Sequence, residues 1–204
     1  MDIVLLDRAA VLESVRVVDR ARPGDWRRPT PCDRWDLRDL VTHMAAQHHG
    51  FAAAARGEGA EAAAWRTADL GDDPAGAYRA AAGVLLDAFA SPGLLDRPFA
   101  LPEISTRPVP GGRAVEFHFV DYVVHAWDVA VALGLPVRLS EPVLRAALPI
   151  ASAVPDGAAR RASDSAFRPS LLPQDATGTA PPGTLPLVLA ALGRPAGWTP
   201  PEVW

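Results

Sequence analysis

One segment of the chain combines an almost continuous apolar sequence with a regular series of polar residues. Residues 112–134 read GRAVEFHFVDYVVHAWDVAVALG, which predicts a helix that is buried on nearly all sides. Four polar residues recur in it at spacings of three, four and three: His118, Asp121, His125 and Asp128. At about 100° per residue, they fall within about one quarter of the helix circumference. Since an unpaired buried polar side chain costs about 1–3 kcal/mol, this stripe predicts a bound group, and a cation suits its carboxylates and imidazoles.

The predicted metal ligands are Asp121 and His125, four residues apart on one helix face, together with His43 from a second predicted helix. A His, an Asp and a His from two facing helices form a three-ligand site with open positions, as in catalytic zinc sites. We expect a divalent metal ion there, with Zn²⁺ as the expected metal, although nitrogen and oxygen ligands also permit iron, nickel or manganese. The alternative is that His43 is a core histidine whose ring bonds a backbone carbonyl.

Other polar residues of the two helices are candidates for roles beside the ion. His118 is predicted to be the catalytic residue, as a proton shuttle or general base; a fourth ligand and a pocket lining are its alternatives. Asp128 is expected to orient a ligand imidazole from behind, or else to cap backbone or pair with an arginine. Gln47 is expected to line the same cavity and bind substrate. For His48 and His49 we expect exposed positions or the helix end, with burial of one of them as the alternative.

Three residues outside this set also bear on chemistry. Tyr122 and Arg160 are predicted to contact substrate, the arginine by holding an anionic group, although a pair such as Arg160 and Arg161 is more often solvated. Cys32 has no evident histidine partner in the sequence, so we expect a packed thiol rather than a nucleophile.

The composition excludes several classes of function. All 20 basic residues are arginine, so the chain has no lysine for Schiff-base chemistry, for a P-loop or for a kinase-type site. The net charge of −4 gives no nucleic-acid footprint. No apolar run is long enough to span a bilayer, and no signal segment is evident, so we expect no membrane partner. The single cysteine excludes an internal disulfide and agrees with a cytoplasmic protein.

Helical patterns punctuated by proline and glycine predict an all-α protein. Four main helices with connections of mixed length indicate a four-helix bundle, and the chain could be a monomer or a homodimer. Residues 91–112 are expected to form an irregular proline-rich loop with a short strand or two. We expect a bundle domain at 1–155 and a C-terminal extension at 156–204 packed on it, which includes an extended crossing segment at 160–183. The predicted helices are 2–20, 36–56, 74–89, 112–134, 141–153 and 185–192.

Two motifs are the most distinctive parts of the sequence: RPTPCDRWDLRDLVTHMAAQHHG at 28–50 and HFVDYVVHAWDVAVALGLP at 118–136. The first resembles the second-helix motif of the DinB/YfiT-like metalloproteins. It is most similar to the actinobacterial branch that includes the N-terminal domain of mycothiol-dependent maleylpyruvate isomerase. The second matches the D-x-x-x-H-x-W-D-x-A-x-x-x-G motif of that branch. Residues 167–198 also resemble the tail of the branch, so the resemblance covers most of the chain.

The resemblance implies a DinB-like four-helix bundle with an open metal site, and it identifies His43, Asp121 and His125 as the ligands. The isomerase has Glu where this chain has Asp121. It further implies a metal-dependent S-transferase or isomerase, in which mycothiol or a similar thiol attacks an electrophilic small molecule. Two alternatives remain. One is a metal-dependent lyase, cyclase or hydrolase of a biosynthetic pathway with His118 as general base, and the other is a non-catalytic protein that binds a metal or ligand.

Overall fold

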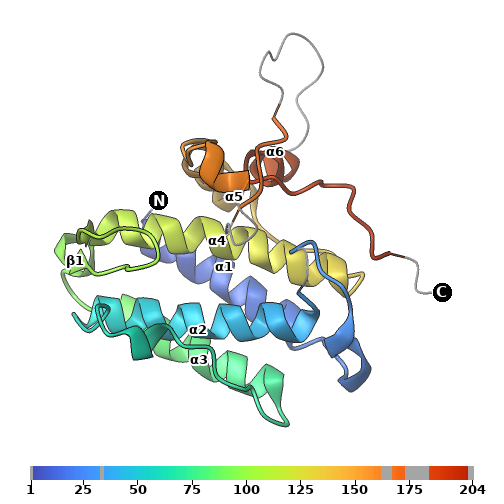
Figure 1. The fold of residues 1–204 in the computed structure, drawn as a ribbon, viewed down its shortest axis with the longest axis horizontal. Coiled ribbons are helices and arrows are strands. Elements are labelled where there is room, and N and C mark those ends of the chain that lie inside the picture. The colour runs from blue at the N-terminus through green and yellow to red at the C-terminus, as the bar shows by residue number, and fades with distance from the viewer. Residues whose placement is uncertain (1, 33–34, 162–166, 173–183, 202–204) are drawn as a thin grey trace.

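Four long helices form the main body of the protein in a computed structural model that describes residues 2–32, 35–161, 167–172 and 184–201. They are α1 (Ile3–Val18), α2 (Leu37–Ala55), α3 (Pro74–Phe89) and α4 (Gly111–Ala132). Helix α1 packs along α4 and α2 packs along α3, while contacts of α1 with α3 and of α2 with α4 close the bundle (Figure 1). The predicted all-α fold and the four-helix bundle are therefore confirmed.

The remaining elements are short. Helices α5 (Glu141–Ser152) and α6 (Thr184–Ala191) pack on each other, and α5 also contacts α1 and α4, so the pair lies against one side of the bundle (Figure 1). Within the proline-rich loop, β1 (Pro98–Phe99) pairs antiparallel with β2 (Val109–Pro110). The single-turn 3-10 helices are η1 (Pro23–Arg27), η2 (Ala62–Trp65), η3 (Leu94–Asp96) and η4 (Ala158–Arg161).

The segment 160–183, which was expected to be extended, begins with a helical turn instead. Arg160 and Arg161 end η4, so a helical turn stands where extended chain was predicted. Residues 167–172 carry no helix or strand, and residues 162–166 and 173–183 of the predicted segment lie outside the described residues.

Local sequence signals set the boundaries of the main helices. Asp36 caps α2: its side chain accepts from the N–H of Asp39, and the Asp39 carboxylate accepts from the N–H of Asp36. This reciprocal pair is a capping box, which satisfies backbone donors that have no partner inside the helix. The Asp73 side chain caps α3 in the same position. Glycines in the left-handed region follow α2 and α4, with φ of 87° at Gly57 and 68° at Gly134, where other residues would be strained.

Helix α4 runs through the core, as its apolar sequence predicts. Most of its 22 residues are buried, and each fully buried aliphatic or aromatic side chain contributes about 1.5–3 kcal/mol. Its polar residues His118, His125 and Asp128 are buried with them. Although α4 is so apolar, no helix in the described part of the chain is long and apolar enough to cross a membrane. The polar side chains of α4 must consequently find partners inside the protein.

The two glycines that open α4 give a matched test of how η3 packs on it. A Cβ atom at Gly111 would lie 2.2 Å from the carbonyl oxygen of Leu94, whereas one at Gly112 would come no closer than 3.9 Å to that of Leu95. We expect Gly111→Ala to lower the free energy of unfolding by about 1–3 kcal/mol, because backbone must move. Gly112→Ala should leave it unchanged or raise it slightly, because alanine favours a helix. Urea unfolding measures both, and equal effects of the two variants would contradict the close packing.

Candidate metal centre

Three of the predicted side chains converge between α2 and α4. His43 comes from α2, Asp121 and His125 come from successive turns of α4, and their potential ligand atoms all lie within 4.8 Å of one another. His125 Nε2 is 3.4 Å from Asp121 Oδ1. The rings of His43 and His125 meet nearly at a right angle, with centroids 5.7 Å apart. His43 and Asp121 are partly exposed whereas His125 is buried, so the cluster is open to solvent on one side.

The ring of His43 is held beside an aromatic wall and kept neutral. Burial, helped by the charge of His125, lowers the pKa of His43 to about 4, although the Asp121 charge opposes the shift. A neutral imidazole keeps the lone pair that a metal ligand needs. The indole of Trp35, which is 38% exposed, lies against this ring with centroids 4.7 Å apart. Trp35 therefore forms an apolar wall on one side of His43.

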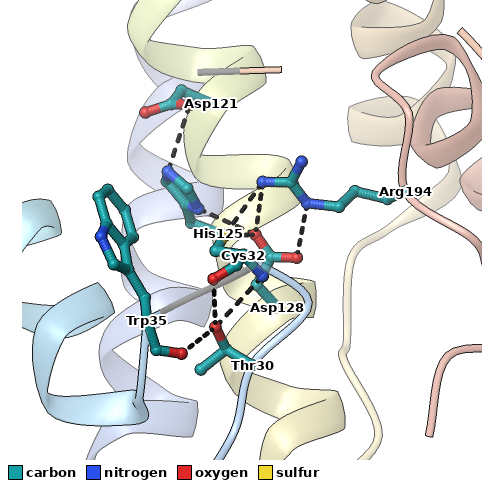
Figure 2. Close-up of polar contacts among 7 residues, drawn as sticks. All are labelled: Thr30, Cys32, Trp35, Asp121, His125, Asp128 and Arg194. Carbon is teal, nitrogen blue, oxygen red and sulfur yellow. Dashed lines mark hydrogen bonds and ion pairs between the residues drawn. The ribbon is translucent and has the colours of Figure 1, made fainter. Parts of the chain in front are cut away.

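A second polar group lies behind His125, at the ring nitrogen that points away from Asp121. The Oδ2 atom of Asp128 lies 3.0 Å from His125 Nδ1 and accepts from the thiol of Cys32 at 3.1 Å. Arg194, which follows α6, donates its Nε to Asp128 Oδ1 at 3.1 Å, and its Nη2 lies 3.1 Å from the Cys32 sulfur (Figure 2). Because an ionised carboxylate only accepts, Nδ1 of His125 carries a proton, and Nε2 is the nitrogen that faces Asp121.

Thr30 holds the loop that carries Cys32. The backbone N–H of Cys32 donates to the Thr30 hydroxyl oxygen, and the hydroxyl itself donates to the carbonyl of Trp35 (Figure 2). This arrangement is an ST-turn, in which a threonine side chain replaces a backbone partner. One loop thus fixes both the thiol behind His125 and the Trp35 indole that lies against His43.

Charges in this group are balanced by pairing. Burial opposes ionisation of Asp128, but the charge of Arg194 and the hydrogen bond with His125 outweigh it and lower the pKa of Asp128. Burial also opposes the charge on His125, but Asp121 and the bond to Asp128 outweigh it and raise the pKa of His125 well above its ordinary value. Burial and the Asp128 charge raise the pKa of Cys32, so the thiol keeps its proton. Between two carboxylates, His125 therefore tends to hold a proton on both ring nitrogens, and a metal ion at Nε2 would take the place of the proton there.

The surroundings of Cys32 differ from the sequence prediction. Its thiol does have a histidine nearby, because Cys32, His125 and Asp128 form a second group whose potential ligand atoms lie within 4.8 Å of one another. The partners come from α4 and from the segment after α6, far away in the sequence, so nothing near Cys32 indicates them. The guanidinium of Arg194 already lies against Cys32 and Asp128, and its charge disfavours a second cation at this position.

Two of the residues predicted to bind substrate lie close to the cluster in sequence but differ in exposure. Gln47 lies one turn from His43 on α2, is 9% exposed, and donates from Nε2 to Glu103 Oε2 at 3.1 Å. Tyr122 is fully buried, and its hydroxyl donates to the carbonyl of Met44. The amide of Gln47 therefore lies at the edge of the core, while Tyr122 is enclosed by protein.

Arg160, the third residue predicted to bind substrate, is buried in the C-terminal extension. Its guanidinium donates to the carbonyls of Ala191 at 2.8 Å and of Val154 at 3.2 Å. Asp156 lies 3.7 Å from the same nitrogen that bonds Ala191. In this position the side chain ties η4 and the end of α5 to α6, and the carbonyls occupy most of its donors.

His118 and His48 belong to a separate, sealed chain of hydrogen bonds. Nδ1 of His118 lies 2.6 Å from Asp7 Oδ1, and its Nε2 lies 3.3 Å from Nδ1 of His48. Nε2 of His48 is 3.3 Å from the Tyr78 hydroxyl, which lies 2.6 Å from that of Ser14. All five side chains are buried. The expectation that His48 is exposed or at the helix end is wrong, and the alternative of one buried histidine holds, because His48 packs fully buried at the centre of this network.

The donors and acceptors in this series of hydrogen bonds can be assigned by starting from Ser14, at the end opposite Asp7. The Ser14 hydroxyl donates to the carbonyl of Val11, so it has no proton left for Tyr78. The Tyr78 hydroxyl must then donate to Ser14, and it can accept from His48. Nε2 of His48 therefore carries the proton of that ring, because burial holds the pKa of His48 well below its ordinary value.

The same assignment fixes the roles of His118. Since Nδ1 of neutral His48 is an acceptor, Nε2 of His118 donates to it. The 2.6 Å bond to Asp7 then holds one further proton, on His118 as an imidazolium or on Asp7 as a carboxylic acid. Both nitrogens of His118 are thus engaged. Its predicted catalytic role stays a prediction, and would require this network to open.

Tyr122 lies between the sealed chain and the open cluster. Its ring stacks on His118 and on His48, with centroids 4.1 Å and 4.3 Å away, and meets His125 edge-on at 6.5 Å.

Sequence reasoning missed the two α1 residues of the sealed series of hydrogen bonds, although a signal exists. Asp7 and Ser14 are seven residues apart, and hence on one face of an apolar helix, just as the polar residues of α4 are.

The helical bundle matches a known family. Residues 8–130 match the model of the mycothiol maleylpyruvate isomerase N-terminal domain. The chain belongs to this family. The matched range includes His43, Asp121, His125 and Asp128, whereas Arg194 lies beyond it. The resemblance of the two sequence motifs is thereby confirmed.

Individual relatives extend this comparison. Uncharacterized proteins MT0763 and Rv0738, from two strains of Mycobacterium tuberculosis, are each 31% identical to the chain over 112 residues. That match covers 52% of the chain and 53% of each relative, so the chain spans about half the length of the curated relatives it matches. A crystal structure of the mycothiol-dependent maleylpyruvate isomerase has the same fold, with a TM-score of 0.52 and 17% sequence identity. The likeness covers 72% of this chain and 66% of that one.

The buried series of hydrogen bonds that contains His48 predicts a pH dependence of the protein's stability. Folded His48 stays neutral, whereas in the unfolded protein it binds a proton below about pH 6.5, so acid favours unfolding. It faces Tyr78 of α3 and both His118 and Tyr122 of α4. From about pH 7.5 to pH 5.5, the free energy of unfolding should fall in wild type by up to about 1.4 kcal/mol per pH unit more than in His48→Gln. Urea unfolding across this range measures the difference, and parallel curves for the two proteins would contradict it.

Proposed function

We propose that the protein is a metal-dependent S-transferase or isomerase that uses mycothiol or a similar thiol on an electrophilic small molecule. The observation that carries this proposal is the convergence of His43, Asp121 and His125 at one partly exposed position between α2 and α4. Membership in the mycothiol maleylpyruvate isomerase N-terminal domain family supports the thiol. The electrophile is left open, because the chain spans only about half of the curated relatives it matches.

The three side chains suit a divalent ion, with Zn²⁺ the expected metal. They offer two imidazole nitrogens and one carboxylate oxygen, a set that zinc accepts and that leaves a coordination position free. His43 is neutral and so has a lone pair to give. Asp128 bonds Nδ1 of His125 and leaves Nε2 directed at Asp121, which is the orientation that a metal-ligating histidine needs.

A bound divalent ion would supply a Lewis acid able to hold a thiol sulfur as thiolate near neutral pH. The chain's own residues place the reactants around it. The Trp35 indole lies against His43 and offers an apolar face to the electrophile. Gln47, one turn further along α2, is the side chain we propose for substrate contact among those predicted, because Tyr122 and Arg160 are committed to backbone carbonyls.

For His118 we propose a positioning role. Its two nitrogens are bonded to Asp7 and His48, and its ring supports Tyr122, the residue next to Asp121. Because the network links α1, α2, α3 and α4, it fixes how the ligand-bearing helices face each other. The thiol then provides the nucleophile, and no protein base is needed at the reacting atom.

The metal assignment predicts a single ion that depends on His125. Elemental analysis of purified protein should find about one zinc per chain in wild type. The variant His125→Ala should lose most of that zinc, because it lacks the most buried of the three proposed ligands. His49→Ala is the matched control, since His49 lies on α2 but is exposed. Full zinc occupancy in His125→Ala, or equal loss in both variants, would overturn the assignment.

The thiol assignment predicts a spectroscopic change on thiol binding. In protein loaded with Co²⁺, mycothiol should produce a sulfur-to-metal charge-transfer band below the free thiol's pKa of about 8.5, because a coordinating thiol loses its proton. Cys32→Ser should be used throughout, so that the protein's own sulfur cannot give the band. A cobalt spectrum unchanged by millimolar mycothiol or N-acetylcysteine would contradict the transferase and favour the oxygen-activating lyase, cyclase or hydrolase.

A further inference from the structure

Arg194 reaches the back of the candidate metal centre from the far end of the chain. It is 4% exposed, and its guanidinium contacts both Asp128 of α4 and Cys32 of the loop before α2 (Figure 2). The two contacts with Asp128 measure 3.1 Å from Nε and 3.4 Å from Nη2, so the planar guanidinium meets both carboxylate oxygens. Such a fork holds a carboxylate in position and orientation more firmly than a single charge does.

The end of α6 is built to deliver this side chain. The N–H of Arg194 donates to the carbonyl of Leu189 at 2.8 Å, and the N–H of Gly193 donates to that of Ala190 at 3.1 Å. This pair of bonds is a Schellman motif, which reverses the chain at a helix C-terminus. Gly193 has φ of 74°, and a Cβ atom there would lie 2.5 Å from the carbonyl oxygen of Arg168. Only glycine fits the turn, and the turn directs Arg194 back toward the bundle.

Asp128 depends on this guanidinium. Its carboxylate is fully buried and its donors are His125, Cys32 and Arg194. Of these, Arg194 is the permanently charged one, and an arginine charge compensates a buried carboxylate that would otherwise be costly. Without it, Asp128 would be free to turn toward solvent or another donor, and His125 would lose the fixed partner at Nδ1 that aims its Nε2 at the site.

We propose that Arg194 is a positioning residue of the metal centre, which acts through Asp128 to hold His125 in its ligating orientation. The proposal rests on the proposed metal site. It makes the segment after α6 part of the centre, although this segment lies outside the range that matches the family model. Among the described residues, the guanidinium of Arg194 bonds Asp128 and Cys32 but neither Asp121 nor His43, so its effect on the ion should pass through Asp128.

The test compares Zn²⁺ affinity, measured by competition with a chelator, in Arg194→Met and Arg160→Met. Both variants remove a buried guanidinium from the same C-terminal extension, but among the described residues Arg160 bonds backbone carbonyls and Asp156 rather than the metal centre. Arg194→Met should bind zinc about 10–100-fold more weakly, as is typical when the partner of a ligand is lost. Arg160→Met should bind it as wild type does. Equal weakening in both variants would show general loosening of the extension and overturn the proposal.

A double-mutant cycle with Asp128→Asn identifies the route. If Arg194 acts through Asp128, Arg194→Met should weaken binding much less in the Asp128→Asn background than in wild type. Independent, multiplicative losses would overturn this route. Should Arg194→Met fail to fold, Arg194→Lys replaces it: lysine keeps the charge but not the fork, so its affinity should fall between those of wild type and Asp128→Asn, and wild-type affinity would count against the proposal. Wild type that binds no zinc would instead refute the proposed function itself.

Discussion

The pairing of the Asp128 carboxylate, fully buried on α4, is the interaction on which much of the structure around the centre depends. A charge that deep in a protein is tolerated only when donors surround it. Here the donors come from His125 on α4, Cys32 in the loop before α2, and Arg194 after α6. One carboxylate therefore joins three segments that are far apart in sequence. The same bonds that satisfy it also orient the histidine of the proposed metal site.

Helix α4 carries two polar groups that differ in their access to solvent. His118 belongs to a sealed chain that runs from Asp7 to Ser14 across all four helices of the bundle, whereas His125 and Asp121 lie at an opening beside His43. Tyr122 separates them, with both histidines of the sealed chain stacked on one ring. The two groups therefore suit different roles. The sealed series of hydrogen bonds fixes the relative position of the helices, and the open group has ligand atoms free to bind the proposed metal ion.

Family membership and geometry support each other at different levels. The match over residues 8–130 establishes the family, and the isomerase crystal structure, at 17% identity, establishes the shared fold alone. What the relatives do not supply is the chemistry of the reacting partner. That has to be sought in the surroundings of the cluster, where the Trp35 indole lies against His43 and Gln47, one turn further along α2, bonds Glu103.

The sequence by itself determined the features that depend on residues close together along the chain. Helix α4, its polar stripe and the start of α2 near residue 36 all follow from spacing along the chain, and the structure has them where predicted. The approach of His43 to Asp121 and His125 was also predictable, because a buried polar stripe requires partners on a neighbouring helix. Only the tertiary structure decided that His48 is sealed in the core, that Cys32 has a histidine beside it, and that Arg194 reaches Asp128. The physical reason is that helical periodicity relates residues within one helix, whereas these contacts depend on how separate segments pack around a common core.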